Sequence, residues 1–244
     1  MTSLMNKVEE SYKINNVKAE QLLSKSIIDE YMTWYKQFQI NQRWVKARSI
    51  LYQLCEEHPE HSNDDWIVAK IWLIGRSYAA AVERVQEKDF LMADDYYYDK
   101  VAQGLHGKFG KELDTHIFSL KSSNNTEDRI FEMLETHQLL TSKLKSITGL
   151  DKRSLASKYL HFHIPSCFYI YDSRANKTIK IFVRKENHNA IPQSDLYDNH
   201  YSDFVYRMLL LQKHLCESLP QGLESITPRF LDSFLLYIHK KYLK

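Results

Sequence analysis

The sequence predicts an all-α protein built as two helical lobes. Only 6 Gly and 5 Pro occur among 244 residues, which is less than the turns of a β-rich protein need. Hydrophobic residues make up 43% of the chain and include 16 Tyr and 11 Phe, so a packed core is expected rather than disorder. Apolar residues also recur at helical spacing along most of the chain.

The expected helices follow one another with recognisable start signals. Asn63 or Asp64 would cap the helix with the clearest period, Asp172 would cap a later one, and Thr227 precedes a proline at the first helical position. Pro165 would end a helix, and residues 167–171 are expected to be extended. The expected helices cover residues 21–38, 44–54, 67–85, 127–147, 154–163, 173–185, 201–219 and 227 onward.

The cysteines limit the cofactors and the compartment. Cys55, Cys167 and Cys216 are scattered singly, so three thiolates cannot fill a four-thiolate iron–sulfur or zinc site, and a disulfide framework is not expected. We therefore expect no metal and no cofactor. Residues 1–16 lack the apolar core of a signal peptide, and no run approaches the roughly 18 apolar residues of a membrane span. A cytoplasmic protein without membrane contact is expected.

The charge distribution suggests a polyanionic partner. The net charge is only +2, but residues 143–185 carry ten basic residues against two acidic ones, and the rest of the chain carries 23 against 29. A basic segment on an otherwise acidic protein is typical of a nucleic-acid contact. The alternative is a solvated helix face on which lysines gather by chance.

The basic residues surround a candidate helical hairpin at about residues 136–163. A short connection, residues 148–153, would join its two helices and expose backbone N–H groups to a phosphate. Gly149, Lys152 and Arg153 would then hold the phosphate backbone of DNA. A glycine after a helix end is common in other helix pairs as well.

The segment resembles the helix-hairpin-helix DNA glycosylase superfamily over about residues 140–180. Ile147–Leu150 resembles the start of the family's hairpin, and Leu155 with Ala156 resembles its continuing helix. The run Tyr169–Asp172 looks like the family's short extended run that ends in an essential aspartate. With Ala156 on the family alanine, Ser154 takes the place of the catalytic lysine, and Asp172 follows it by 18 residues, which matches the family's interval.

Two positions depart from the family pattern. Asp151 stands where the second hairpin glycine is expected, which puts metal-assisted phosphate binding by this turn in doubt. Ser154 replaces the lysine, as in the adenine-mismatch branch, which favours simple base excision over Schiff-base lyase chemistry. The cysteine count excludes the iron–sulfur branches. The ends of the chain are similar to bacterial 8-oxoguanine-glycosylase-like proteins, some of which occur among phage-defence genes.

The resemblance implies a monofunctional DNA N-glycosylase that acts on double-stranded DNA. Such an enzyme flips the target base out of the duplex and hydrolyses its N-glycosidic bond. Asp172 would stabilise the oxocarbenium-like sugar and activate water. Alternatively, Asp172 serves only as a helix cap, or fills both roles. A damaged purine, a mismatched base and a hypermodified pyrimidine of phage DNA all remain open as substrates.

Further candidates lie on the two helices that precede Asp172. Lys158 lies one turn after Ser154, and it is either a displaced Schiff-base nucleophile, a phosphate contact or a surface lysine. His161 is a candidate pocket residue. Arg76, Ser77 and Tyr78 occupy the region where the resemblance places a wedge that fills the duplex, although Tyr78 also continues an apolar stripe and is then a core residue.

The remaining candidates follow Asp172. Ser173, Arg174 and Lys177 open the next expected helix, and we expect them to contact DNA. Phe230 and Asp232 lie early in the last helix, the part of the chain from which the resemblance draws base-pocket residues.

The expected lobes are residues 1–65 with 186–244, formed by both chain ends, and residues 66–185, which contain the hairpin. A cleft between them would hold the flipped nucleotide, and a monomer is expected. Two other functions stay open: a catalytically inactive helix-hairpin-helix protein that only binds DNA, and an N-glycosidase that acts on free nucleotides.

Overall fold

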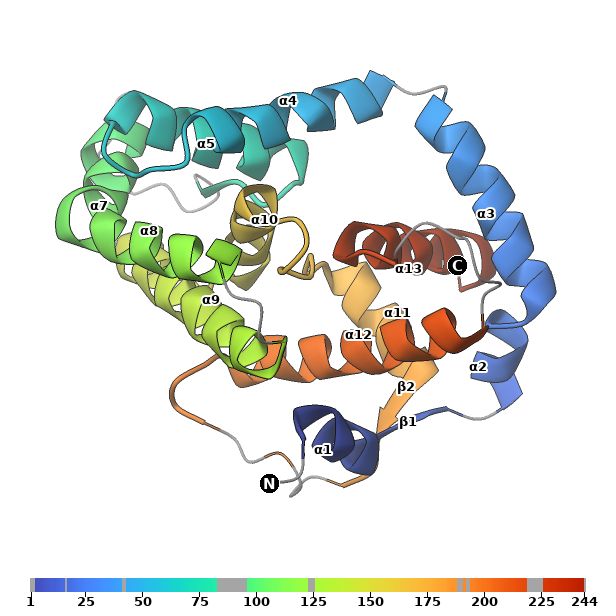
Figure 1. Cartoon of the computed structure of the whole chain (residues 1–244). Coiled ribbons are helices and arrows are strands. Elements are labelled where there is room, and N and C mark those ends of the chain that lie inside the picture. Colours follow the sequence, from blue (N-terminus) through green and yellow to red (C-terminus); the bar gives the residue numbers. More distant parts are fainter. Residues whose placement is uncertain are drawn as a thin grey trace. The chain divides into compact units, whose positions relative to one another are not determined.

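The computed structural model is predominantly helical, which confirms the all-α class (Figure 1). Within the described part of the chain, the strands form a single two-stranded sheet. The described residues are 3–15, 17–40, 43–82, 96–122, 126–187, 191, 194–218 and 226–243.

The chain divides into two compact units, defined by contacts between residues. Unit 1 comprises Met1–Val45, Tyr169–Asp195 and Asn199–Lys244, and unit 2 comprises Lys46–Phe168 and Leu196–Asp198. The lobes expected from the sequence have other bounds, and they stay a prediction.

Unit 1 is built from both ends of the chain and a central segment. Helix α11 packs against α13, α12 and α2, and β1 and β2 pair beside α12. Large side chains such as Tyr31, Phe182, Phe204 and Phe234 are fully buried. Its elements are α1 (Leu4–Ser11), β1 (Tyr12–Ile14), α2 (Val17–Leu22), α3 (Lys25–Ile40), α11 (Ser173–Phe182), β2 (Val183–Lys185), α12 (Asn199–Ser218) and α13 (Pro228–Tyr242).

The two-stranded sheet corrects the expected helix over 173–185. Helix α11 ends at Phe182, and Val183 continues with extended backbone as the first residue of β2. Strand β2 pairs antiparallel with β1, with Tyr12 opposite Lys185. Arg207 of α12 donates a hydrogen bond to the Val183 carbonyl. In a continued helix this carbonyl would instead accept from a backbone N–H of the same helix. Contacts distant in sequence therefore override the local helical pattern.

The expected helix over 21–38 is interrupted near its start. Helix α2 ends at Leu22, and α3 begins at Lys25. The Ser24 carbonyl accepts from the N–H groups of Ile27 and Ile28, both at 3.0 Å, so a new helix is started there. The apolar period alone could not show this break, because Leu22 and Ile28 are buried on either side of it.

Unit 2 is a bundle in which α9 packs against α8 and α10, and α10 packs against α5 (Figure 1). Its core includes the fully buried apolar side chains of Ile67, Leu113, Leu144 and Leu160. The boundary between the units falls within α4. The elements are α4 (Arg43–Glu57), α5 (Asp64–Ser77), η2 (Tyr97–Ala102), α7 (Gln103–Leu105), α8 (Gly107–Ser122), α9 (Thr126–Thr148) and α10 (Arg153–His163).

Helix α5 ends earlier than the expected bounds of 67–85. It stops at Ser77, and Ala79 then has φ +52°, a left-handed conformation that ends a helix. The Ala80 N–H donates to the Gly75 carbonyl at 2.8 Å, so the chain turns back over the last helical turn. A Cβ at Gly75 would approach the Ala81 backbone to 3.2 Å, which explains the glycine. Residues 83–85 lie outside the described part of the chain.

The predicted helix caps are confirmed. The Asn63 side chain accepts from the Trp66 N–H at 3.1 Å, and Thr227 Oγ1 accepts from the Phe230 N–H at 3.1 Å. Asp172 caps α11, with its Oδ1 at 2.9 Å from the Arg174 nitrogen. Each of these caps satisfies an N–H group that has no partner within its helix.

Candidate functional site

The turn between α9 and α10 has a glycine in the left-handed conformation. Gly149 has φ +72°, and its N–H donates to the Lys145 carbonyl at 2.8 Å. Thr148 Oγ1 accepts from the Leu150 N–H at 3.2 Å. A Cβ at Gly149 would meet no atom within 4 Å, so the need for glycine is conformational. A short turn thus joins α9 and α10, whereas the helix-hairpin-helix motif and its DNA-binding role stay predictions.

The basic residues of this turn contact the protein itself. Lys152 Nζ donates to the carbonyl oxygens of Ala81 and Val82 at 3.3 and 3.2 Å. Arg153 forms an ion pair with Asp198, whose side chain is 7% exposed. Both cations therefore hold segments of unit 2 in place. A DNA phosphate would have to share them with these partners.

Ser154, Lys158 and Tyr78 lie together in unit 2. Lys158 Nζ donates to Ser154 Oγ at 2.8 Å and to the Tyr78 carbonyl at 3.2 Å. Lys158 is only 3% exposed, so it is not the surface lysine that one reading of the sequence allowed. Its ammonium also lies 6.0 Å from the centre of the Tyr78 ring. The structure thus places a buried amine against a serine hydroxyl, and the amine also fixes the chain just after α5.

The expected wedge residues differ in exposure. Arg76 and Ser77 are exposed in the last turn of α5, and the guanidinium carbon of Arg76 lies 6.0 Å from the centre of the Trp72 ring. Tyr78 is half-buried, and its ring packs edge-on against Phe162 at 5.4 Å. The apolar packing of Tyr78 agrees with its interpretation as a core residue, whereas Arg76 and Ser77 lie on the surface.

His161 is fully buried, and both of its ring nitrogens have contacts. Nε2 lies 2.9 Å from the Tyr52 hydroxyl, and Nδ1 lies 2.8 Å from the Phe168 carbonyl oxygen. These two contacts join α10 to α4 and to the segment that follows α10. The arrangement is that of a hydrogen-bonded core histidine, and a role in a base pocket stays a prediction.

In unit 1, Asp172 starts α11 beside a row of exposed polar side chains. Its Oδ1 lies 2.9 Å from the Arg174 backbone nitrogen and 3.2 Å from Arg174 Nε. The Asp172 side chain is 19% exposed and that of Arg174 is 59% exposed. Ser173, Lys177 and Lys180 are also exposed, while Ala175 and Ile179 are buried. The helix dipole and the adjacent guanidinium both favour a negatively charged Asp172.

Arg174 also lines a cavity of about 700 Å³ in unit 1. The cavity lies among residues of α3, α11 and α13. Its wall combines three aromatic rings with four cations and a histidine, and none of the described residues that line it is a carboxylate. The lining residues are Trp34, Phe38, Arg174, Arg229, Ser233, Leu236, Tyr237, His239, Lys240 and Lys241.

Phe230 and Asp232 support this cavity without lining it. Asp232 is 2% exposed, and its Oδ2 accepts from Arg229, a lining residue, at 2.9 Å. Phe230 is 8% exposed, and its ring packs edge-on against Tyr31 and Tyr35 at 5.2 and 5.5 Å. The two predicted pocket residues therefore hold α13 in position, while neighbours on the same helix face the cavity.

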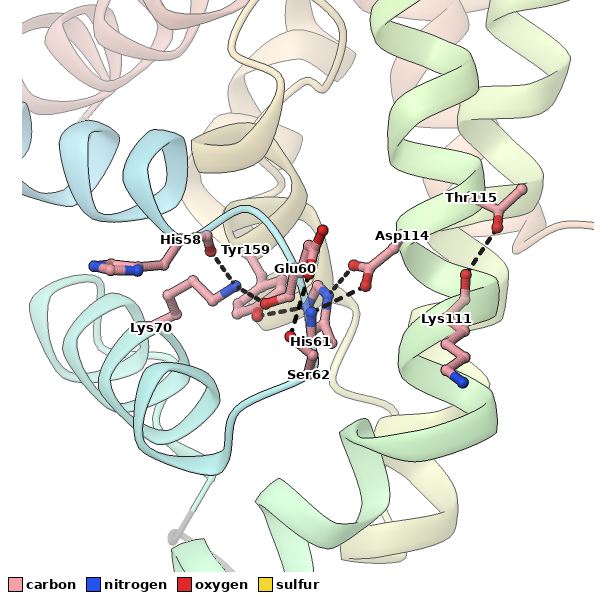
Figure 2. A network of polar contacts seen from close by, with 9 residues as sticks. All are labelled: His58, Glu60, His61, Ser62, Lys70, Lys111, Asp114, Thr115 and Tyr159. Atoms are coloured by element: carbon pink, nitrogen blue, oxygen red, sulfur yellow. Dashed lines mark hydrogen bonds and ion pairs between the residues drawn. The ribbon is translucent and has the colours of Figure 1, made fainter.

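A second polar cluster lies inside unit 2 (Figure 2). His61, on the loop between α4 and α5, has its Nδ1 at 2.5 Å from Asp114 Oδ1 and its Nε2 at 2.8 Å from the Tyr159 hydroxyl. The His61 backbone N–H donates to Asp114 Oδ2 at 3.0 Å. Lys70 Nζ donates to the carbonyls of His58 and Glu60 at 2.8 and 3.1 Å. We call His61, Lys70, Asp114 and Tyr159 the His61 network.

Burial determines the charges of the His61 network. It lowers the pKa of His61 despite the hydrogen bond to Asp114, and it lowers the pKa of Lys70 to about 8. Burial opposes ionisation of Asp114, but hydrogen bonds from the His61 side chain and backbone hold the Asp114 pKa below its usual value. These directions indicate a neutral His61 that donates from Nδ1 to a carboxylate and accepts from Tyr159 at Nε2.

The His61 network and most of the cavity wall are not recognisable in the sequence. Trp34 and Phe38 are one helical turn apart on α3, and Tyr237 and Lys241 are one turn apart on α13. This spacing puts each pair on one face of its helix, which is the only local signal available. The spacing of the apolar residues over 21–38 predicts only a helix, because nothing local to it shows the cations that α13 brings beside it.

Comparisons with protein-family models, with curated proteins and with solved structures found no match. Among the described residues, no group of three or more His, Cys, Asp or Glu side chains is placed to hold a metal ion. No helix in the described ranges is both long enough and apolar enough to cross a membrane.

Proposed function

We propose that the protein is a monofunctional DNA N-glycosylase in which Asp172 is the catalytic carboxylate. The observation that carries the proposal is the environment of Asp172 at the start of α11. Its carboxylate accepts two hydrogen bonds from Arg174, and the exposed face of the same helix presents Ser173, Arg174, Lys177 and Lys180. A negative charge is thereby kept next to a surface that attracts DNA phosphates.

In the proposed reaction the bond between the sugar and the base breaks as positive charge develops on the sugar. The Asp172 carboxylate stabilises that charge and orients the water that adds to the anomeric carbon. The proton released by the water goes to solvent through the carboxylate, and the base departs with the bonding electrons. Ser154 stands at the position of the family's catalytic lysine and has no amine. No Schiff base with the sugar forms at this position, so the reaction ends at an abasic site.

Base release from duplex DNA tests the proposal. Duplexes that carry oxidised purines, mismatched bases or hypermodified pyrimidines are incubated with the protein and then treated with hot alkali, which cuts abasic sites. We expect strand cuts for one substrate class and their loss in Asp172→Asn. Asn is as good a helix cap as Asp, so the variant keeps the fold. Asp195→Asn, an exposed carboxamide substitution elsewhere in unit 1, serves as the matched control.

The alternative mechanism uses the Lys158 amine as a nucleophile. If its amine attacked the sugar, borohydride would trap a covalent complex with DNA, and Lys158→Met would abolish the trap. We expect no trapped complex. Full base release by Asp172→Asn would contradict the proposal. Salt-sensitive DNA binding with no abasic sites on any duplex would instead identify a binding protein.

A further inference from the structure

The cavity in unit 1 combines features that catalysis by Asp172 does not require. Trp34 stacks on Phe38 with ring centres 4.8 Å apart, and the Tyr237 ring lies 5.0 Å from Trp34. The aromatic side of the cavity is therefore held in place by its own ring contacts. Aromatic faces of this kind bind planar rings by stacking.

The cations of the cavity are oriented by carboxylates that do not line it. Arg174 pairs with Asp172, Arg229 pairs with Asp232 at 2.9 Å, and Lys241 pairs with Glu30. Hydrogen bonds from Lys241 and Tyr237 lower the pKa of Glu30, so this pair stays charged at neutral pH. Each carboxylate thus fixes a cation at the wall.

Lys240 completes the basic side of the cavity. It is exposed on α13, and no carboxylate of the described residues forms an ion pair with it. His239 is fixed by a contact of 3.2 Å between its Nδ1 and Thr178 Oγ1. The wall therefore offers an anion at least one ammonium that is not already neutralised, next to cations of fixed position.

We infer that this cavity binds a nucleotide, a planar ring attached to a phosphate, with the ring against Trp34 and the phosphate near Lys240. The volume of about 700 Å³ lies within the usual range for small-molecule sites, about 300–1,000 Å³. A bare phosphate would leave the aromatic wall unused, and an uncharged ring would leave the cations unused. The inference does not rest on the proposed glycosylase activity, because it concerns binding alone.

Calorimetric titration with a nucleoside 5′-monophosphate tests this site, with the same nucleoside and inorganic phosphate as separate probes. We expect the monophosphate to bind at least about tenfold more tightly than either, because only it uses both walls. Lys240→Gln should weaken its binding about tenfold, the effect of losing one charge-assisted contact. Lys7→Gln, an exposed lysine on α1, is the matched control and should leave binding unchanged.

Trp34→Leu tests the aromatic wall and should also weaken monophosphate binding about tenfold, with Trp66→Leu of unit 2 as its control. Equal binding of phosphate and monophosphate, or equal effects of Lys240→Gln and Lys7→Gln, would overturn the inference. Because Lys240 is exposed, that variant folds whatever Trp34→Leu does to the core.

The same chemistry occurs in a free nucleotide and in a nucleotide of a DNA strand. A single-stranded oligonucleotide should compete with the monophosphate if the bound nucleotide belongs to a DNA strand. Competition that is weaker in Lys240→Gln would support the site and identify a strand as the source of the nucleotide. Binding of the monophosphate alone would support it with a free nucleotide. No probe in this experiment reports base release, so failure of the site is distinguishable from failure of the glycosylase proposal.

Discussion

The His61 network of unit 2 and the cavity of unit 1 both contain histidine, lysine and tyrosine side chains, but they differ in exposure. The His61 side chain is 0% exposed, and both of its ring nitrogens are within 2.8 Å of a partner. In the cavity, Arg174, Lys240 and Lys241 are open to solvent, and the side chains of Lys241 and Arg174 are 47% and 59% exposed. A closed network stabilises the fold, whereas open cations with fixed positions are suited to a ligand.

Charged and aromatic side chains therefore do not identify a functional site by themselves. Lys70 is completely buried with two carbonyl partners, so its charge is used within the protein. Lys240 is exposed, so its charge is available to a ligand. Substitutions in the His61 network should therefore change stability, and substitutions in the cavity should change ligand binding.

Removal of Asp114 should have the largest effect on stability. Asp114→Ala leaves both the His61 backbone N–H and its Nδ1 without their acceptor, in a residue that is 1% exposed. We expect a loss of about 3 kcal/mol in the free energy of unfolding, measured by urea denaturation with circular dichroism. Asp114→Asn keeps a neutral acceptor and should lose about half as much.

Asp195→Ala, which removes an exposed carboxylate, is the control for Asp114→Ala and should change stability by less than about 0.5 kcal/mol. If the two alanine variants unfold at the same urea concentration, the His61 network does not stabilise unit 2, and the contrast between the two regions is lost.

Features that depend only on neighbouring residues are recognisable in the sequence. Asn63, Asp172 and Thr227 act as helix caps because a cap needs only the N–H groups two or three residues further on. The turn at Gly149 is local in the same way. These features could be predicted without knowledge of the fold.

Features that join distant segments could not be predicted. Strand β2 forms because β1 pairs with it, and the pattern of residues 173–185 does not show β1. Lys152 was expected at a phosphate. Its contacts with the carbonyls of Ala81 and Val82 could not be foreseen, because these residues are distant in sequence. The cavity wall likewise combines α3, α11 and α13, whose rings and cations come together only in the folded unit.

Acid should weaken unit 2 through its buried histidines. His163 is 4% exposed, its ring nitrogens have no hydrogen-bond partner among the described residues, and burial lowers its pKa well below 6.5. Between the folded and unfolded pKa values the unfolded chain binds more protons. The contribution of a neutral His163 to stability is therefore fully present above about pH 6.5. As the pH decreases below that value, this contribution is lost by up to about 1.4 kcal/mol per pH unit.

The variant His163→Phe should reduce this pH dependence. It removes the titratable group, so we expect it to lose up to about 2 kcal/mol less stability than the unmodified protein between pH 8 and pH 5. His200→Phe, at the exposed start of α12, should leave the dependence as it is. Identical pH profiles for His163→Phe and the unmodified protein would show that His163 is not held neutral.

The smallest effect on stability should come from substitutions of Asp172. They best distinguish a side chain that acts on a substrate from one that stabilises the fold. Asp172→Ala removes the cap of α11 and should lower the free energy of unfolding by about 1 kcal/mol, whereas Asp172→Asn keeps the cap and should lower it by a few tenths at most. Both should lose base release completely if the carboxylate is catalytic. A stability loss without any change in base release would mean that Asp172 is only a helix cap. Loss of base release in Asp172→Asn at unchanged stability would show that this carboxylate acts on substrate, in contrast to Asp114, which acts on the fold.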